Sequence, residues 1–157
     1  MANGQSGPHL TMAVLCENVV QSSEGVLSLI NIIDQVTQEA SGTEVPSQMP
    51  PFQLQVRGVV GLKAGSARGR YAVKLRPEDP SGSQLSAMEM PVQFGGPAGG
   101  GVNLLLNVGM QIELEGLYWF DVIFVEALEA ERLLTRIPLN VLYHPTRTGP
   151  APPPPTA

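Results

Sequence analysis

Residues 12–36 read MAVLCENVV, QSSEG and VLSLINIIDQV, and this stretch decides the fold. Two runs rich in valine, isoleucine and leucine flank a polar loop, Gln21–Gly25, that ends in glycine. This pattern predicts an antiparallel β-hairpin with a longer loop. In the second run Val26, Ile30 and Ile32 fall on one face, whereas Leu27 falls on the other. Because both faces are largely apolar, we predict that this run is a central strand, buried on both sides.

Outward from this hairpin, apolar residues alternate with polar ones in a series of short runs. Phe52–Lys63 and Arg70–Arg76 are joined by a short glycine-containing segment and are predicted to form a second hairpin. Residues 38–51 hold three prolines and a glycine, which predicts a long crossing loop. Further strands are predicted at 84–94, 102–114, 117–125 and 133–143. The pattern predicts an all-β fold, a single antiparallel β-sandwich of about seven or eight strands.

The 157 residues suffice for one domain that buries a core without disulfides or metals. Residues 1–9 are small and polar and are predicted to be a flexible lead. The β-sandwich domain is predicted to span residues 10–144. Residues 145–157 are rich in proline, which predicts a disordered tail.

The net charge and the apolar segments of the chain indicate which class of molecule the protein binds. The formal net charge is −5, which argues against nucleic acid because that affinity comes from neutralising phosphates. The N-terminus has neither the basic nor the apolar region of a secretory signal, so we expect a cytoplasmic protein. The apolar run at 117–125 is too short to span a membrane as a helix. We therefore expect a protein partner or a homo-oligomer, formed through an edge strand such as Gln84–Phe94, where Pro91 removes a ladder donor.

Residues for nucleophilic or metal chemistry are scarce. The two histidines, His9 and His144, lie at the margins of the predicted domain, and we interpret them as solvated side chains. Cys16 is the only cysteine and lies in an apolar strand, which predicts a small buried hydrophobe. No spacing of histidine and cysteine matches a zinc site. We predict no catalytic residue, no cofactor and no metal, and therefore no enzyme.

Three carboxylates interrupt otherwise apolar runs, namely Glu17, Asp34 and Asp121. A carboxylate in such a place must be paired or protonated, because burying a bare charge is costly. An arginine such as Arg57 or Arg136 is the expected partner, in a structural ion pair. The alternative is a carboxylate-dependent hydrolase with a pair of catalytic acids.

Basic residues gather in the second predicted hairpin, where residues 63–76 hold five of the nine in the chain. One interpretation is a solvated outer face, partly neutralised by Glu113 or Glu115 on a neighbouring strand. The other interpretation is a docking patch for an acidic partner or an anion. The residues of this candidate patch are Lys63, Arg68, Arg70, Lys74 and Arg76.

The two ends of the predicted fold resemble a known family. The segments are Ala13–Asn18 followed by Gly25–Asp34, and later Gly116–Val125 with Ile137–Val141. Together they resemble a family of small uncharacterised bacterial proteins, a domain of unknown function. The resemblance implies a β-sandwich with a closing hairpin, and it supplies no catalytic residue.

Two binding functions remain open beside the hydrolase. The leading hypothesis is a non-enzymatic interaction or accessory module, because the chain lacks convergent polar groups. The alternative is a β-sandwich that binds a small ligand or a carbohydrate, with Trp119 and Tyr118 as stacking platforms.

Overall fold

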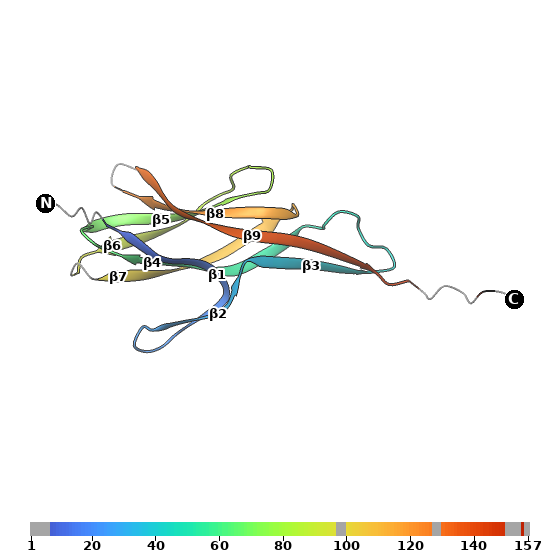
Figure 1. The fold of residues 1–157 in the computed structure, drawn as a ribbon, viewed down its shortest axis with the longest axis horizontal. Helices are drawn as coiled ribbons and strands as arrows, with labels where there is room; N and C mark the ends of the chain where they lie inside the picture. Colours follow the sequence, from blue (N-terminus) through green and yellow to red (C-terminus); the bar gives the residue numbers. More distant parts are fainter. Residues whose placement is uncertain (1–6, 97–99, 127–129, 150–154, 156–157) are drawn as a thin grey trace.

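The computed structural model describes residues 7–96, 100–126, 130–149 and 155. Within them the chain is all-β, with nine strands in two sheets (Figure 1). The strands are β1 (His9–Gln21), β2 (Leu27–Ile33), β3 (Gln35–Gly42), β4 (Phe52–Lys63), β5 (Gly69–Glu78), β6 (Met88–Phe94), β7 (Gly101–Ile112), β8 (Gly116–Val125) and β9 (Glu131–Arg147). Sheet A has the order β2-β1-β4-β7, and sheet B has the order β3-β9-β8-β5-β6.

The predicted strands are confirmed wherever the alternation of apolar and polar residues is regular. β4 has the predicted bounds, and it alternates buried and exposed residues from Leu54 to Arg57. The closing hairpin is confirmed as well, because β8 pairs with β9 in antiparallel register. At the first hairpin, Gly25 donates a backbone hydrogen bond to Ser22, so the predicted loop is also present.

One strand was missed, which raises the count from about seven or eight to nine within the described residues. β3 occupies residues 35–42, part of which was predicted to lie in a crossing loop. It pairs with β9 in parallel register, so the prediction of a purely antiparallel fold is wrong. Only Asp34 separates β2 from β3, and its carbonyl accepts a hydrogen bond from Asn140 of β9. The chain therefore passes from sheet A to sheet B without reversing direction.

The second predicted hairpin is wrong. β4 pairs with β1 and β7 in sheet A, whereas β5 pairs with β6 and β8 in sheet B. β5 alternates in burial from residue 73 to 78, as predicted, whereas β4 alternates only in its first half, since residues 58–62 are buried on both faces. The segment between the two strands connects two sheets. Alternation reports which face of a strand is buried, and it does not report which strand lies beside it.

The core draws on both sheets. Leu54, Val60 and Leu106 of sheet A belong to one buried cluster with Val73 and Phe120 of sheet B. Since each strand contributes alternate residues, the apolar rows predicted for β4, β5, β7 and β8 supply most of this cluster.

Cys16 is a buried free cysteine, as predicted. Burial raises the pKa of its thiol above the usual value, and the nearby Arg57 charge opposes this rise only in part. The raised pKa disfavours the reactive thiolate.

The strand predicted to be central is an edge strand. β2 pairs with β1 on one side, and no described strand pairs with its other side. The prediction that both its faces are buried is also wrong, since Ile30 and Ile32 are exposed. Apolar residues on both faces identify a surface that needs a partner, but they do not show that the partner lies in the same chain.

The chain ends differ slightly from the predicted boundaries. β1 begins at His9, and β9 continues to Arg147, past the residue where the tail was predicted to begin. Most of the proline-rich segment lies outside the described residues. Across the described ranges, no helix is long and apolar enough to cross a membrane.

Candidate interaction surface

The five residues of the predicted basic patch are divided between two sheets. Lys63 ends β4 in sheet A, and Arg68 lies in the connection to sheet B, where its guanidinium donates to the carbonyls of Gly65 and Ala67. The remaining three, Arg70, Lys74 and Arg76, lie on β5 in sheet B. The fold does not bring the predicted patch together on one hairpin.

Lys74 and Arg76 are already engaged by acidic residues of the same sheet. Lys74 Nζ lies 3.1 Å from Glu131 Oε1, and Arg76 lies 3.6 Å from the other oxygen of that carboxylate. Arg76 also lies 4.0 Å from Asp121. The neutralising residues come from β8 and β9, so Glu113 and Glu115 are not the partners that the sequence suggested.

Asp121 is the one buried charged residue in the described part of the chain, with 7% of its surface exposed. Arg136 Nε donates to its carboxylate at 2.6 Å, and the same guanidinium donates to Glu78 at 3.0 Å. The hydrogen bond to Asp121 is the main cause that raises the pKa of Arg136. A structural ion pair with Arg136 was one of the two predicted arrangements.

The predicted stacking platforms are not free. Tyr118 is buried, and its hydroxyl donates to the Leu114 carbonyl at 2.8 Å. Trp119 is half-buried, and the Arg136 guanidinium lies 4.8 Å above its ring centre. A cation over the ring takes the position that a stacking sugar would need.

The other two candidate carboxylates are exposed. Asp34 lies at the surface between β2 and β3. Glu17 accepts a hydrogen bond from the Asn31 amide at 2.7 Å. Because both side chains are exposed, neither needs the arginine that we predicted. Among the described residues, no group of three or more histidine, cysteine or acidic side chains is arranged to hold a metal ion.

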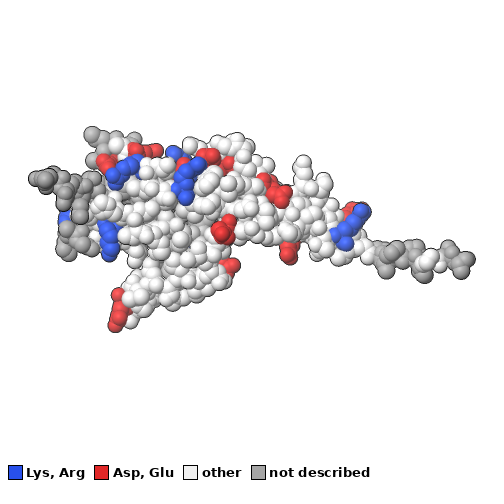
Figure 2. Space-filling view, viewed as in Figure 1, with Lys and Arg blue, Asp and Glu red and all other residues white. Residues whose placement is uncertain are grey.

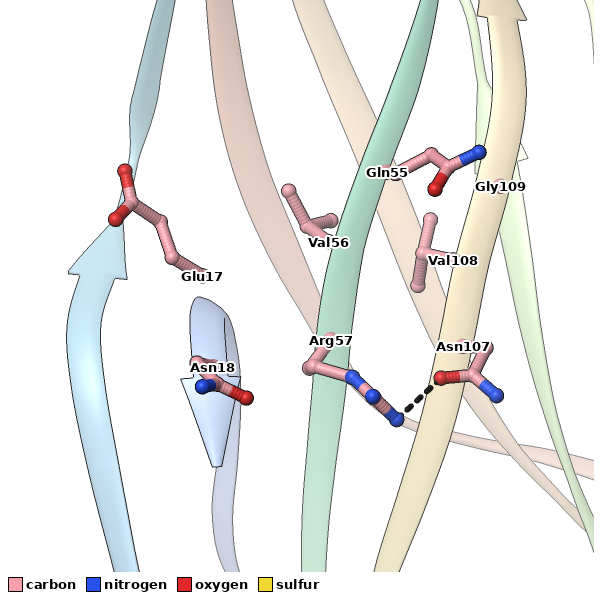
Figure 3. A pocket seen from close by; sticks show the side chains of 8 residues that line it. All are labelled: Glu17, Asn18, Gln55, Val56, Arg57, Asn107, Val108 and Gly109. Carbon is pink, nitrogen blue, oxygen red and sulfur yellow. Dashed lines mark hydrogen bonds between the residues drawn. The ribbon is translucent and has the colours of Figure 1, made fainter. Parts of the chain in front are cut away.

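A polar groove lies on sheet A between β1, β4 and β7 (Figure 3). It has a volume of about 380 Å³ and is lined by Glu17, Asn18, Gln55, Arg57 and Asn107, among others. Figure 3 shows the Arg57 guanidinium directed across the sheet to Asn107, to which it donates a hydrogen bond. The groove therefore offers amide and carboxylate groups, with its cation already engaged.

The hairpin at the edge of sheet A carries more than half of the large apolar side chains that are exposed in the described residues. We call residues 18–32 the arm, and Figure 1 shows it projecting from the rest of the molecule. Of the seven large apolar side chains exposed in the described residues, four lie on the arm. These four, called the apolar row below, are Val20, Val26, Ile30 and Ile32.

The apolar row occupies one face of the arm. Val20 lies opposite Ser28, and Cys16 lies opposite Ile32, so the even-numbered residues of both strands share a side. Val26 is 62% exposed and Ile32 is 61% exposed. Within β2 only Ile33, at the base of the arm, packs against the core cluster.

The arm leaves the body at a kink. Asn31 has a positive φ of 54°, a conformation that asparagine tolerates better than most residues with a side chain. Its amide is held by Glu17 of the neighbouring strand. Beyond this point the hairpin has no further layer of the described chain against it, and an isolated two-stranded hairpin is marginally stable in water.

Sequence reasoning missed this surface because it assigned the apolar residues of β2 to the core. The signal was present in the double-sided apolar pattern of residues 26–33 combined with the absence of charge from that segment. A strand of this kind fits an interface as well as a core.

Comparison with protein families identifies a match over most of the chain. The model of a family of unknown function, DUF6941, matches residues 11–142. No curated protein matches the chain.

Proposed function

Because the chain belongs to DUF6941, a family of unknown function, we propose its function from the geometry alone: a non-enzymatic β-sandwich interaction module that binds a protein through the arm. The observation that carries this proposal is the apolar row, exposed on a hairpin that projects from the body. Contiguous exposed apolar surface rimmed by polar residues is typical of protein interaction sites. We place the module in the cytoplasm, as expected from the sequence.

The charged residues support a binding role over a catalytic one. The most buried carboxylate, Asp121, is held by Arg136, and the candidate basic residues Lys74 and Arg76 are paired within sheet B. These charged groups interact with one another on the surface of sheet B. The apolar row on the arm, by contrast, is exposed and available to a partner.

The test is site-specific photo-crosslinking in cells that express the full chain. A photoreactive residue replaces Val26 on the arm, and the control carries it at Gln93, an exposed position on β6. We expect adducts from position 26 that are absent from position 93. The captured protein, once purified, should bind the wild-type chain and fail to bind the double variant Ile30→Lys/Ile32→Lys. Equal adducts from both positions would contradict the proposal.

The polar groove supports a second candidate function, the binding of a small polar ligand. Glu17, Gln55 and Asn107 line a space large enough for such a ligand. A thermal-shift screen against sugars and nucleotides tests it, with Gln55→Ala as the variant that should lose any shift. A shift that survives this substitution would argue against the groove.

A further inference from the structure

The free edge of β2 is the starting point. β2 pairs with β1 on one side only, so the backbone groups on its other side have no partner strand among the described residues. An unpaired edge is a template for another strand. The arm therefore offers both an apolar face and a row of backbone hydrogen-bonding groups.

Natural sheets protect such edges with charge, proline or a cover, and the residues of β2 include neither charge nor proline. Leu27–Ile33 reads LSLINII. By contrast, the edge strand β6 holds Glu89 and Pro91. The positive φ of Asn31 is the one backbone irregularity on β2. Residues 27–30, between the loop and Asn31, form a regular strand without charge or proline.

The charge on the arm indicates what can bind it. Between residues 18 and 32 the only charged side chain is that of Glu24, which is not part of the apolar row. Figure 2 shows the projecting arm as an uncharged surface with acidic atoms at its end. An uncharged strand gives no electrostatic preference for a basic or an acidic partner, and it is not repelled by an identical strand even though the chain carries a net charge of −5.

We propose that the arm binds a second copy of this chain, with the two β2 strands antiparallel across a two-fold axis. An antiparallel edge is complementary to itself, because a two-fold axis presents the same donors and acceptors to each copy. With the axis perpendicular to the sheet, the two apolar rows lie on the same side and form one continuous surface. Sheet A of one copy then continues into sheet A of the other. This proposal rests on the proposed function and names its partner.

The experiment measures the mass of the purified full chain by sedimentation velocity over a series of concentrations. We expect the wild-type chain to reach twice its monomer mass, and Ile30→Lys/Ile32→Lys to weaken the dimer about tenfold or more. The matched control is Leu117→Lys/Leu133→Lys in sheet B. Ile30 and Leu117 are each 42% exposed, while Ile32 and Leu133 are 61% and 55% exposed. The control should dimerise as the wild type does.

Folding is checked separately by circular dichroism and thermal unfolding of each variant as a monomer. All variants should match the wild-type monomer, since all four positions are at the surface. If the arm variant unfolds, the photoreactive Val26 chain tests the proposal instead: ultraviolet light should link two copies of the purified protein, and the chain with the photoreactive residue at Gln93 should stay single.

The outcomes separate this proposal from the proposed function. A wild-type chain that stays monomeric, together with arm adducts to a different protein in cells, overturns the dimer and leaves the interaction module standing. A monomer with no arm-specific adduct overturns both. A dimer that survives the arm substitutions places the contact elsewhere and overturns the dimer proposal.

Discussion

β2 and β6, two of the four edge strands in the described sheets, differ in how their unpaired sides are protected. On β6, Val92 and Phe94 are buried in the core, while Glu89 and Pro91 face outward and discourage another strand from pairing. On β2, only Ile33 packs against the core, and two of the exposed side chains, Ile30 and Ile32, are large and apolar. An edge strand whose inner face packs against the core, and whose outer face carries charge or proline, is stable within one chain and does not favour pairing with another. β2 is anchored only at Ile33 and holds neither charge nor proline, which is why we propose that it forms an interface.

The largest difference should appear in the stability of the monomer. Phe94→Ala removes a buried ring and should lower the free energy of unfolding by about 3–5 kcal/mol, because a cavity remains. Ile32→Ala removes an exposed side chain and should change it by less than about 0.5 kcal/mol. Urea denaturation at concentrations where the chain is monomeric measures both. An equal loss from both variants would mean that β2 packs within the monomer.

Hydrogen exchange of the wild-type chain should distinguish β2 from β6 by the rates at which their backbone amides exchange. In the monomer, the hydrogen-bonded amides of residues 27–30 should exchange about a hundredfold faster than those of β6, a difference of about 2.8 kcal/mol in opening free energy. The reason is that the arm can open without disturbing the core. At concentrations where two copies associate, residues 27–30 should become protected and β6 should not change. Protection of the arm that is independent of concentration would contradict this.

The kink at the base of the arm gives a smaller effect. Asn31→Val puts a β-branched residue into a left-handed conformation and should destabilise the monomer by about 1–2 kcal/mol, or straighten the arm. Asn31→Gly keeps the conformation accessible and serves as the control, with a smaller loss. Thermal unfolding of the two variants measures the difference. If the two variants had the same stability, the positive φ at residue 31 would not be required by the fold.

The smallest effect on stability, and a clear effect on association, is expected at Pro91. Pro91→Val on β6 should change the free energy of unfolding by less than about 0.5 kcal/mol, since the side chain is exposed. It restores a backbone donor to the β6 edge, so the variant should self-associate more readily than the wild type in light scattering. The control Pro80→Val, at an exposed turn position outside the strands, should leave association unchanged. If Pro91→Val behaves in the same way, proline is not what protects β6.

The sequence by itself determined the local features of this protein. Alternation with a period of two located β4 to the residue. The apolar run around Cys16 predicted that it is buried, and the cost of burying a charge predicted that Asp121 would need an arginine such as Arg136. Each of these depends on the residues of one strand, or on the cost of burying a single group, so a single run of sequence contains the information.

The tertiary structure decided which strands lie side by side. It separated Lys63 from Arg76 by placing β4 and β5 in different sheets, and it paired β3 with β9 in parallel. It also left β2 at an edge, with its apolar face uncovered. A strand's own sequence shows which of its faces avoid water, and only the arrangement of the whole chain decides what covers them, because strand pairing joins residues far apart in sequence.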